Sequence, residues 1–250
     1  MRPLRSSLSA FAAGLLCLAT ACHADEAAPA ELPELGLMGT IPIYWGESDD
    51  FGQLLSDEGE VHWARAQLEA GYRLRLLDML SEESLAGLEV LMLAQPRALS
   101  PQENVALDTW VRRGGKLLLF ADPLLTGESR FAIGDRRRPQ DVILLSPILN
   151  HWGLTLVFDD EAPAGYTLVP TAGVPIPVNL PGSLSITTGE ADCELRAADV
   201  LAECAIGQGH ALVLADAALL DLQQPHPRAS PALAWLTREA FGTGGESAGN

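Results

Sequence analysis

The sequence predicts an α/β protein with a mainly parallel sheet, helices on both faces of the sheet and a β-meander near the C-terminus. Three observations indicate this fold. Short apolar runs alternate with segments whose apolar residues recur at helical spacing. Glycine and proline stand at the boundaries of these segments, where turns are needed. Toward the C-terminus, short strand-like runs follow one another with turn residues between them.

The first half of the chain supplies the elements of the parallel sheet. Apolar runs typical of strands occupy 37–45, 72–80, 88–94 and 116–123. Two helical patterns lie among them, at 61–70 and after Ser100. The resulting β-α-β-β-α-β order favours parallel strands joined by crossovers, with helices on both sides.

The helix after Ser100 carries a start signal in its sequence. Ser100 is suited to cap the helix, Pro101 fits its first position and Glu103 completes a capping box. The pattern ends at Gly114. The strand that follows, 116–123, is apolar almost throughout, which predicts burial on both faces.

The second half begins with a helix over 142–152, ended by Gly153, and a strand over 154–160. The region 163–188 is rich in proline and predicts irregular connections and edge strands. Later elements are a meander with strands at 193–197, 200–207 and 210–216, and a closing helix over 232–241.

The N-terminus has the pattern of a secretory signal peptide over residues 1–24. Arg2 and Arg5 precede an apolar run at 8–18, and small residues follow it. The run is shorter than the roughly 20 residues that span a bilayer. We therefore expect an exported mature chain, periplasmic or secreted. Cleavage after small residues competes with lipidation of Cys22, which would anchor the protein to a membrane.

Behind the leader we expect a disordered linker at 25–36, a single domain at 37–242 and a disordered tail at 243–250. The full chain has a formal net charge of -17, and removal of the leader takes away arginines but no acids. Nucleic-acid partners are disfavoured because their phosphates would meet a repulsive field.

Two cysteines, Cys193 and Cys204, remain after the leader. An even pair in an exported chain predicts a disulfide, which would join two neighbouring strands of the meander. The alternative is two unpaired, buried thiols.

Two blocks of the sequence resemble a known family. The first is LMLAQPRALSPQENVALDTWVRRGGKLLLFADP at 91–123, and the second is AIGQGHALVLADAALL at 205–220. Both are similar to GldG-like auxiliary domains of uncharacterised ABC-type transport systems, which are related to non-catalytic domains of the class I glutamine-amidotransferase-like fold. The resemblance implies a flavodoxin-like sheet and a role beside a transporter or another envelope assembly. It implies no reaction, ligand or cofactor.

Catalytic relatives of this fold hold a cysteine in a Gly-x-Cys-x-Gly elbow after the strand that corresponds to 116–120. Here the turn contains Asp122 and no nucleophile. No Gly-x-Ser-x-Gly occurs, and no histidine has a second ligand at metal-binding spacing. We therefore expect neither an enzyme nor a metal site.

Ligands of doubly wound sheets bind beyond the carboxyl ends of the strands. The polar residues expected at such a rim are Glu47, Asp49, Asp50, Gln95, Arg97 and Asp122. A solvated acidic loop and a cap at a strand end are the structural alternatives for these residues.

The sequence thus predicts an exported, non-catalytic binding or scaffold domain, auxiliary to an ABC-type transport system or an envelope assembly and partnered by proteins of that assembly. The alternatives are a periplasmic hydrolase with an unrecognised site and a lipid-anchored envelope scaffold.

Overall fold

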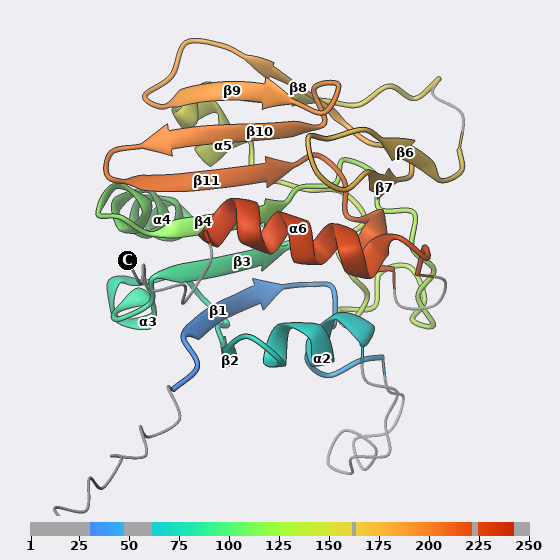
Figure 1. Ribbon diagram of the computed structural model, residues 1–250, viewed down its shortest axis with the longest axis horizontal. Coiled ribbons are helices and arrows are strands. Elements are labelled where there is room, and N and C mark those ends of the chain that lie inside the picture. The colour runs from blue at the N-terminus through green and yellow to red at the C-terminus, as the bar shows by residue number, and fades with distance from the viewer. Residues whose placement is uncertain (1–30, 48–61, 162–163, 222–224, 243–250) are drawn as a thin grey trace, which may run out of the picture. The chain divides into compact units, whose positions relative to one another are not determined.

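The structure, a computed structural model, describes residues 31–47, 62–161, 164–221 and 225–242. The predicted signal peptide, the tail at 243–250 and most of the predicted linker lie outside the described residues. From Leu32 onward the chain forms one compact unit (Figure 1).

A seven-stranded sheet forms the centre of this unit. In spatial order its strands are β2 (Arg73–Leu76), β1 (Glu34–Gly39), β3 (Val90–Ala94), β4 (Lys116–Phe120), β11 (Gly209–Leu214), β10 (Leu201–Ile206) and β9 (Asp192–Arg196). The pairs from β2 to β11 are parallel, whereas β11, β10 and β9 pair antiparallel. The mainly parallel α/β sheet and the C-terminal meander are therefore confirmed, and the order of the parallel strands is the flavodoxin-like one.

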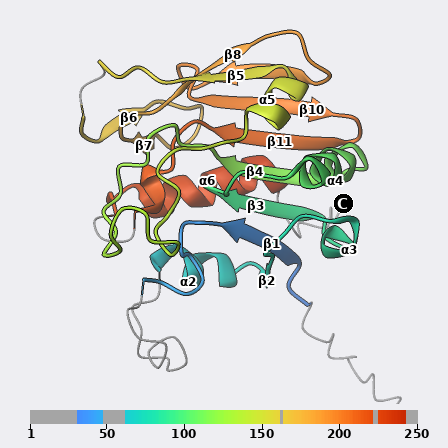
Figure 2. The same cartoon turned by 180° about the vertical axis from the view of Figure 1, so that it is seen from behind.

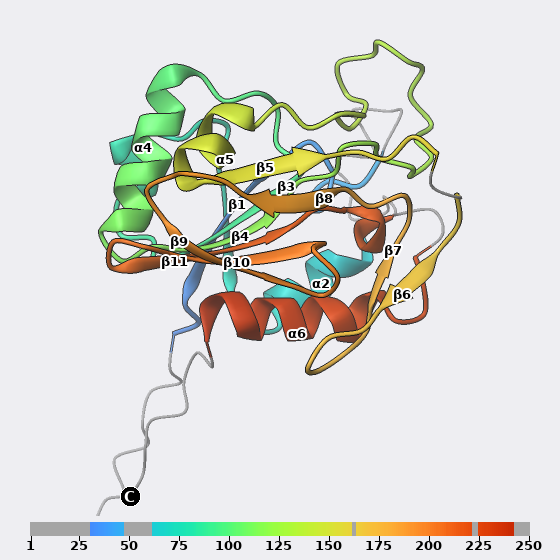
Figure 3. The ribbon, with the colours of Figure 1, turned by 90° about the horizontal axis from the view of Figure 1, so that it is seen from above.

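Helices cover both faces of the sheet. They are α2 (Trp63–Glu69), α3 (Glu82–Leu85), α4 (Pro101–Arg112), α5 (Ser146–Trp152) and α6 (Ala229–Phe241). Figure 3 shows α4 and α5 on one face and α2 and α6 on the other. No helix in the described part of the chain is long and apolar enough to cross a membrane.

The central strands form the core. Every residue of β3 is buried, and Leu117, Leu118, Leu119 and Phe120 of β4 have no exposed surface. Their near-continuous apolar sequence is typical of parallel strands covered on both faces, so this prediction is confirmed.

The helix-start signal at Ser100 is also confirmed. Its hydroxyl accepts a hydrogen bond from the backbone N–H of Glu103, and the Glu103 carboxylate accepts one from the backbone N–H of Ser100. This is the capping box expected from sequence. Gly153 ends α5 in the left-handed region, at φ 85°.

The first two strands differ from their predicted bounds. β1 begins at Glu34, inside the predicted linker, because Leu35 is fully buried in the core. It ends at Gly39, where a side chain would lie 2.0 Å from the carbonyl oxygen of Ala94. β2 is likewise shorter than 72–80 and is followed by the unpredicted helix α3.

In the described part of the chain, four strands lie outside the main sheet. They form the antiparallel pairs β5 (Leu154–Val157) with β8 (Ser183–Ile186), and β6 (Thr167–Val169) with β7 (Ile176–Val178). Figure 2 shows β5 and β8 beside the antiparallel end of the main sheet. The prolines of 163–188 thus accompany short strands and irregular connections, as predicted.

The meander carries the predicted disulfide. Cys193 in β9 and Cys204 in β10 are directly opposite in the antiparallel register, and their sulfurs are bonded. The alternative of two free thiols is therefore wrong.

Candidate functional site

Two neighbouring parallel strands end in the same dipeptide. β4 is followed by Ala121-Asp122, and β11 is followed by Ala215-Asp216. Phe120 and Leu214 are partners in the register of these strands. The two carboxyl groups consequently come together at the carboxyl edge of the sheet, where both side chains have no exposed surface.

Both carboxyl groups are fully engaged with backbone donors. Asp122 accepts from the N–H of Leu124 (2.8 Å) with Oδ1 and from that of Ala217 (2.9 Å) with Oδ2. Asp216 accepts from Ala218 (2.8 Å) with Oδ1 and from Asn179 (2.9 Å) with Oδ2.

These bonds divide into two kinds. Each carboxyl closes a local turn with the residue two positions ahead, which is the Asx-turn geometry. Each also accepts one bond from a distant segment, so that the pair ties β4, β11 and the end of β7 together.

Burial changes the protonation of the pair. It raises the pKa of Asp122 to about 6, against two backbone hydrogen bonds that lower it. The pKa of Asp216 is raised well above its ordinary value, first by burial and then by the charge of Asp122. Two buried carboxyl groups that interact in this way hold a proton to higher pH than an ordinary aspartate does.

Gln95 closes the edge next to this pair. It follows β3 with a positive φ of 50°. Its side-chain oxygen accepts from the backbone N–H of Asp122 (2.8 Å), and its amide donates to the carbonyls of Asp122 and Gln140 (2.9 Å each). Thr40 donates its hydroxyl hydrogen to the carbonyl of Gln95 (2.5 Å). The ends of β1, β3 and β4 are thereby joined.

The other expected rim residues are distributed differently. Glu47 is buried and accepts from the backbone N–H of Arg130 (3.0 Å). Asp49 and Asp50 lie outside the described residues. Of the six, the structure therefore brings Gln95 and Asp122 into direct contact, and ligand binding by this set stays a prediction.

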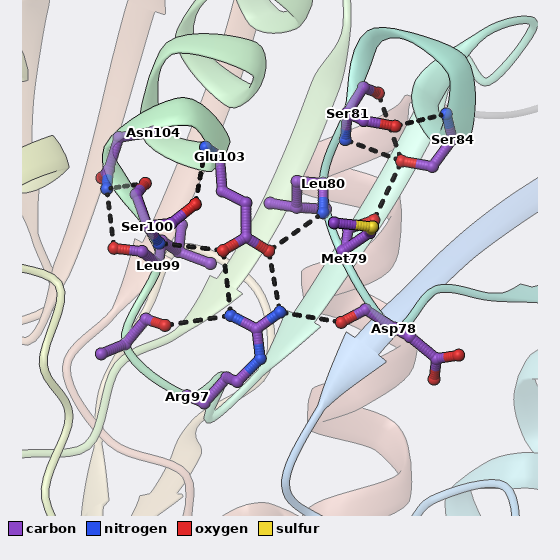
Figure 4. A network of polar contacts seen from close by, with 11 residues as sticks. Asp78, Met79, Leu80, Ser81, Ser84, Arg97, Leu99, Ser100, Glu103 and Asn104 are labelled. Atoms are coloured by element: carbon purple, nitrogen blue, oxygen red, sulfur yellow. Dashed lines mark hydrogen bonds and ion pairs between the residues drawn. The ribbon is translucent and has the colours of Figure 1, made fainter.

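Arg97 belongs to a separate network, shown in Figure 4. Its guanidinium donates to both carboxylate oxygens of Glu103 (2.8 and 3.0 Å) and to the carbonyl of Asp78 (2.8 Å). Glu103 also accepts from the N–H of Leu80 (3.2 Å). The Arg97 hydrogen bonds lower the pKa of Glu103 to about 2. This network fixes the start of α4 against the loop that follows β2.

His62 adds a buried titratable group near the same edge. Its Nδ1 accepts from the N–H of Ala64 (3.1 Å), and its Nε2 lies 2.7 Å from the carbonyl oxygen of Leu220. The two partners require a neutral ring with the proton on Nε2. Burial lowers the pKa of His62 accordingly. His62 is the N-cap of α2.

Little space remains at this edge. The cavity beside Glu47, Leu125 and Asp221 has a volume of 30 Å³, enough for a water molecule but not for a metabolite. Two other hollows are larger. One of 700 Å³ lies between α3 and α4, and one of 310 Å³ lies beside β5 and has Pro123 in its lining. Among the described residues, no group of three potential ligands could hold a metal ion.

Asp216 is the residue that sequence reasoning missed. The available signal was the repeated Ala-Asp after two apolar strands, at Asp122 and Asp216. It becomes informative only once β11 is known to lie beside β4.

Comparisons with known proteins show the fold and a similarity to one family. The N-terminal domain of mmIFT52 has a TM-score of 0.54 and 14% identity over 86% of this chain and 99% of that domain. The exo-β-1,4-mannosidase Op5Man5 from Opitutaceae bacterium strain TAV5 has a TM-score of 0.45 and 13% identity over 84% of this chain. This chain corresponds to only 34% of the mannosidase.

A cytoplasmic protein from Salmonella typhimurium LT2 has a TM-score of 0.45 and 14% identity, over 84% of this chain and 96% of that protein. At 14% identity the likeness to the mmIFT52 domain shows the fold alone. A comparison with curated proteins found no match.

The family comparison matches residues 55–164 to the family described as ABC-type uncharacterized transport system. The match includes the block at 91–123, whereas the block at 205–220 lies outside it. Over residues 55–164 the chain is thus similar to this family, in agreement with the resemblance of the first block.

Proposed function

We propose that the chain is an exported, non-catalytic domain that binds a protein partner within an ABC-type transport system. One observation carries the non-catalytic part of this proposal. The carboxyl edge of the sheet, where ligands of such folds bind, is closed by the bonds of Gln95, Asp122 and Asp216.

The turn after β4 supports this view. Related enzymes hold a nucleophile there, and this chain has Asp122, whose two oxygens accept backbone N–H groups. A carboxylate acting as a base or nucleophile must reach a substrate atom. Asp122 has no exposed surface and lines neither the 30 Å³ cavity nor the 310 Å³ groove, so it offers no such approach.

The export part of the proposal is supported by two independent features. The leader pattern at 1–24 directs secretion, and the Cys193–Cys204 disulfide suits an oxidising compartment. In this proposal the mature chain acts in the periplasm, either free or anchored through Cys22.

The test is fractionation of cells that express the full chain, followed by co-purification with the components of an ABC-type transporter encoded nearby. We expect a periplasmic or membrane-anchored protein that lacks the leader and co-purifies with those components. Release of a membrane-bound form by Cys22→Ala would identify the lipid anchor. A cytoplasmic chain that retains its leader would overturn the proposal.

A second candidate, a hydrolase, is favoured by one observation, the pair of buried carboxyl groups with raised pKa values at Asp122 and Asp216. Such pairs supply an acid and a base in several enzyme classes. Hydrolase or amidase turnover by the purified chain that disappears in Asp122→Asn would establish this candidate and overturn the non-catalytic role.

A further inference from the structure

β5 has one free edge. In the described part of the chain it pairs with β8 alone. The backbone N–H of Thr187 donates to the carbonyl of Gly153 (2.8 Å), just before the strand begins. Gly153 and Thr187 are thus a hydrogen-bonded pair, and such pairs alternate along an antiparallel ladder. The backbone N–H and C=O of Thr155 therefore face β8, and those of Leu156 face the opposite edge.

A groove without charge runs along this edge. Its volume is 310 Å³, and it lies between β5 and the segment that leads into α5. Val142, Leu145, Leu149, Leu156 and Phe158 line it together with neutral polar residues. The protein has a net charge of -17, yet no charged residue lines this groove. The lining is therefore suited to apolar side chains.

Exposed apolar side chains lie in the groove and next to it. Val142, Leu144 and Val157 are 45%, 53% and 53% exposed. An unpaired strand edge next to exposed apolar side chains is a template for an added strand, whose main chain binds the edge while alternate side chains enter pockets.

The end of the groove is acidic. Asp159, Asp160 and Glu161 follow Phe158 and are exposed. The ion pairs of the described residues include none of these three carboxylates. A partner with a basic residue at this end would therefore find a complementary charge.

We infer that β5 binds an extended segment of a partner protein, with apolar residues at alternate positions and a lysine or arginine at the end that meets Asp159 and Asp160. This inference deepens the proposed binding function by naming the chemistry of the partner. A second copy of the chain fits less well because its negative charge would repel the first. The larger groove between α3 and α4 has charged walls and no free strand edge.

The test uses the purified chain and labelled peptides of alternating valine and threonine. One peptide ends in two lysines, a second begins with them, and a third and fourth carry glutamates at the same places. We expect one lysine peptide to bind in fluorescence anisotropy, severalfold more tightly than its glutamate counterpart. Binding should slow hydrogen exchange at the Leu156 amide. N-methylation of the peptide backbone should abolish binding.

Matched variants locate the site. Val142→Glu places a charge in the groove and should weaken binding about tenfold or more. Ile133→Glu makes a similar change at a side chain that is 88% exposed and does not line the groove, and should leave binding unchanged. Asp159→Asn with Asp160→Asn should bring the lysine and glutamate peptides to similar affinities.

Three outcomes would overturn the inference. They are unchanged exchange at Leu156 with every peptide, equal weakening by the two glutamate variants, and a dimer in sedimentation that Val142→Glu dissociates. The last would assign the edge to a second copy. Because synthetic peptides replace the partner, failure here is distinguishable from failure of co-purification with a transporter.

Discussion

The buried pair Asp122 and Asp216 should make the protein less stable as pH rises. In the folded chain the pKa of Asp122 is about 6, whereas an unfolded aspartate titrates near 3.9. The unfolded state therefore loses its proton first. The stabilisation is fully present below the unfolded pKa and is lost as pH rises through about 6.

The size of the effect follows from this difference of about two pKa units. At about 1.4 kcal/mol per unit, Asp122 should lower the free energy of unfolding by about 3 kcal/mol in full, of which about 2 kcal/mol falls between pH 4 and pH 7. Asp216 acts in the same direction. The side chain of Asp122 has no exposed surface, so solvent screening does not reduce this loss of stability.

The assay is urea denaturation followed by circular dichroism at several pH values, on the wild type and on Asp122→Asn. The difference between the two proteins isolates the carboxyl group from His62, whose lowered pKa makes stability rise with pH over part of this range. Asp199→Asn, at an exposed position, is the control and should parallel the wild type. A constant difference between wild type and Asp122→Asn from pH 4 to 7 would refute the reasoning.

Three further changes have expected outcomes. Glu103→Gln removes the charge-assisted pair with Arg97 at a side chain that is 5% exposed. It should lower the free energy of unfolding, measured with denaturant at pH 7, by about 2 kcal/mol. This difference from the wild type should shrink as pH falls from about 4 to 2. Replacing Cys193 and Cys204 by serine should cost about 2–3 kcal/mol, and alkylation of the unreduced wild type should label neither cysteine. Gly39→Ala would bring a methyl group to 2.0 Å from the carbonyl oxygen of Ala94. It should lower the melting temperature by several degrees. An unchanged melting temperature would show that the backbone at the end of β1 moves to make room for the methyl group.

Local signals in the sequence predicted the elements that depend on them. The capping box at Ser100 and Glu103 and the apolar strand at 116–123 need only neighbouring residues, and both are found. The disulfide was also predictable because removal of the predicted leader would leave Cys193 and Cys204 as the only pair of cysteines in the sequence. The helix α3 was missed since its serine cap and its four residues resemble a turn.

The candidate site was harder because it depends on distant segments. Asp122 was singled out as a strand-end residue, but its partner Asp216 lies far along the chain. Their meeting requires β11 to pair with β4, and no spacing in the sequence sets that register. Arg97 was placed at the correct edge, yet its bond to Glu103 depends on how the turn after β3 folds back.

The bonds of Asp122 bear on what a cysteine nucleophile in this turn would require. A cysteine at position 122 would restore the element that catalytic relatives carry, but it would leave the backbone N–H groups of Leu124 and Ala217 without their acceptors. Each unsatisfied buried donor costs about 1–3 kcal/mol. A single substitution of Asp122 by cysteine is consequently not neutral, and both turns would first have to be rebuilt.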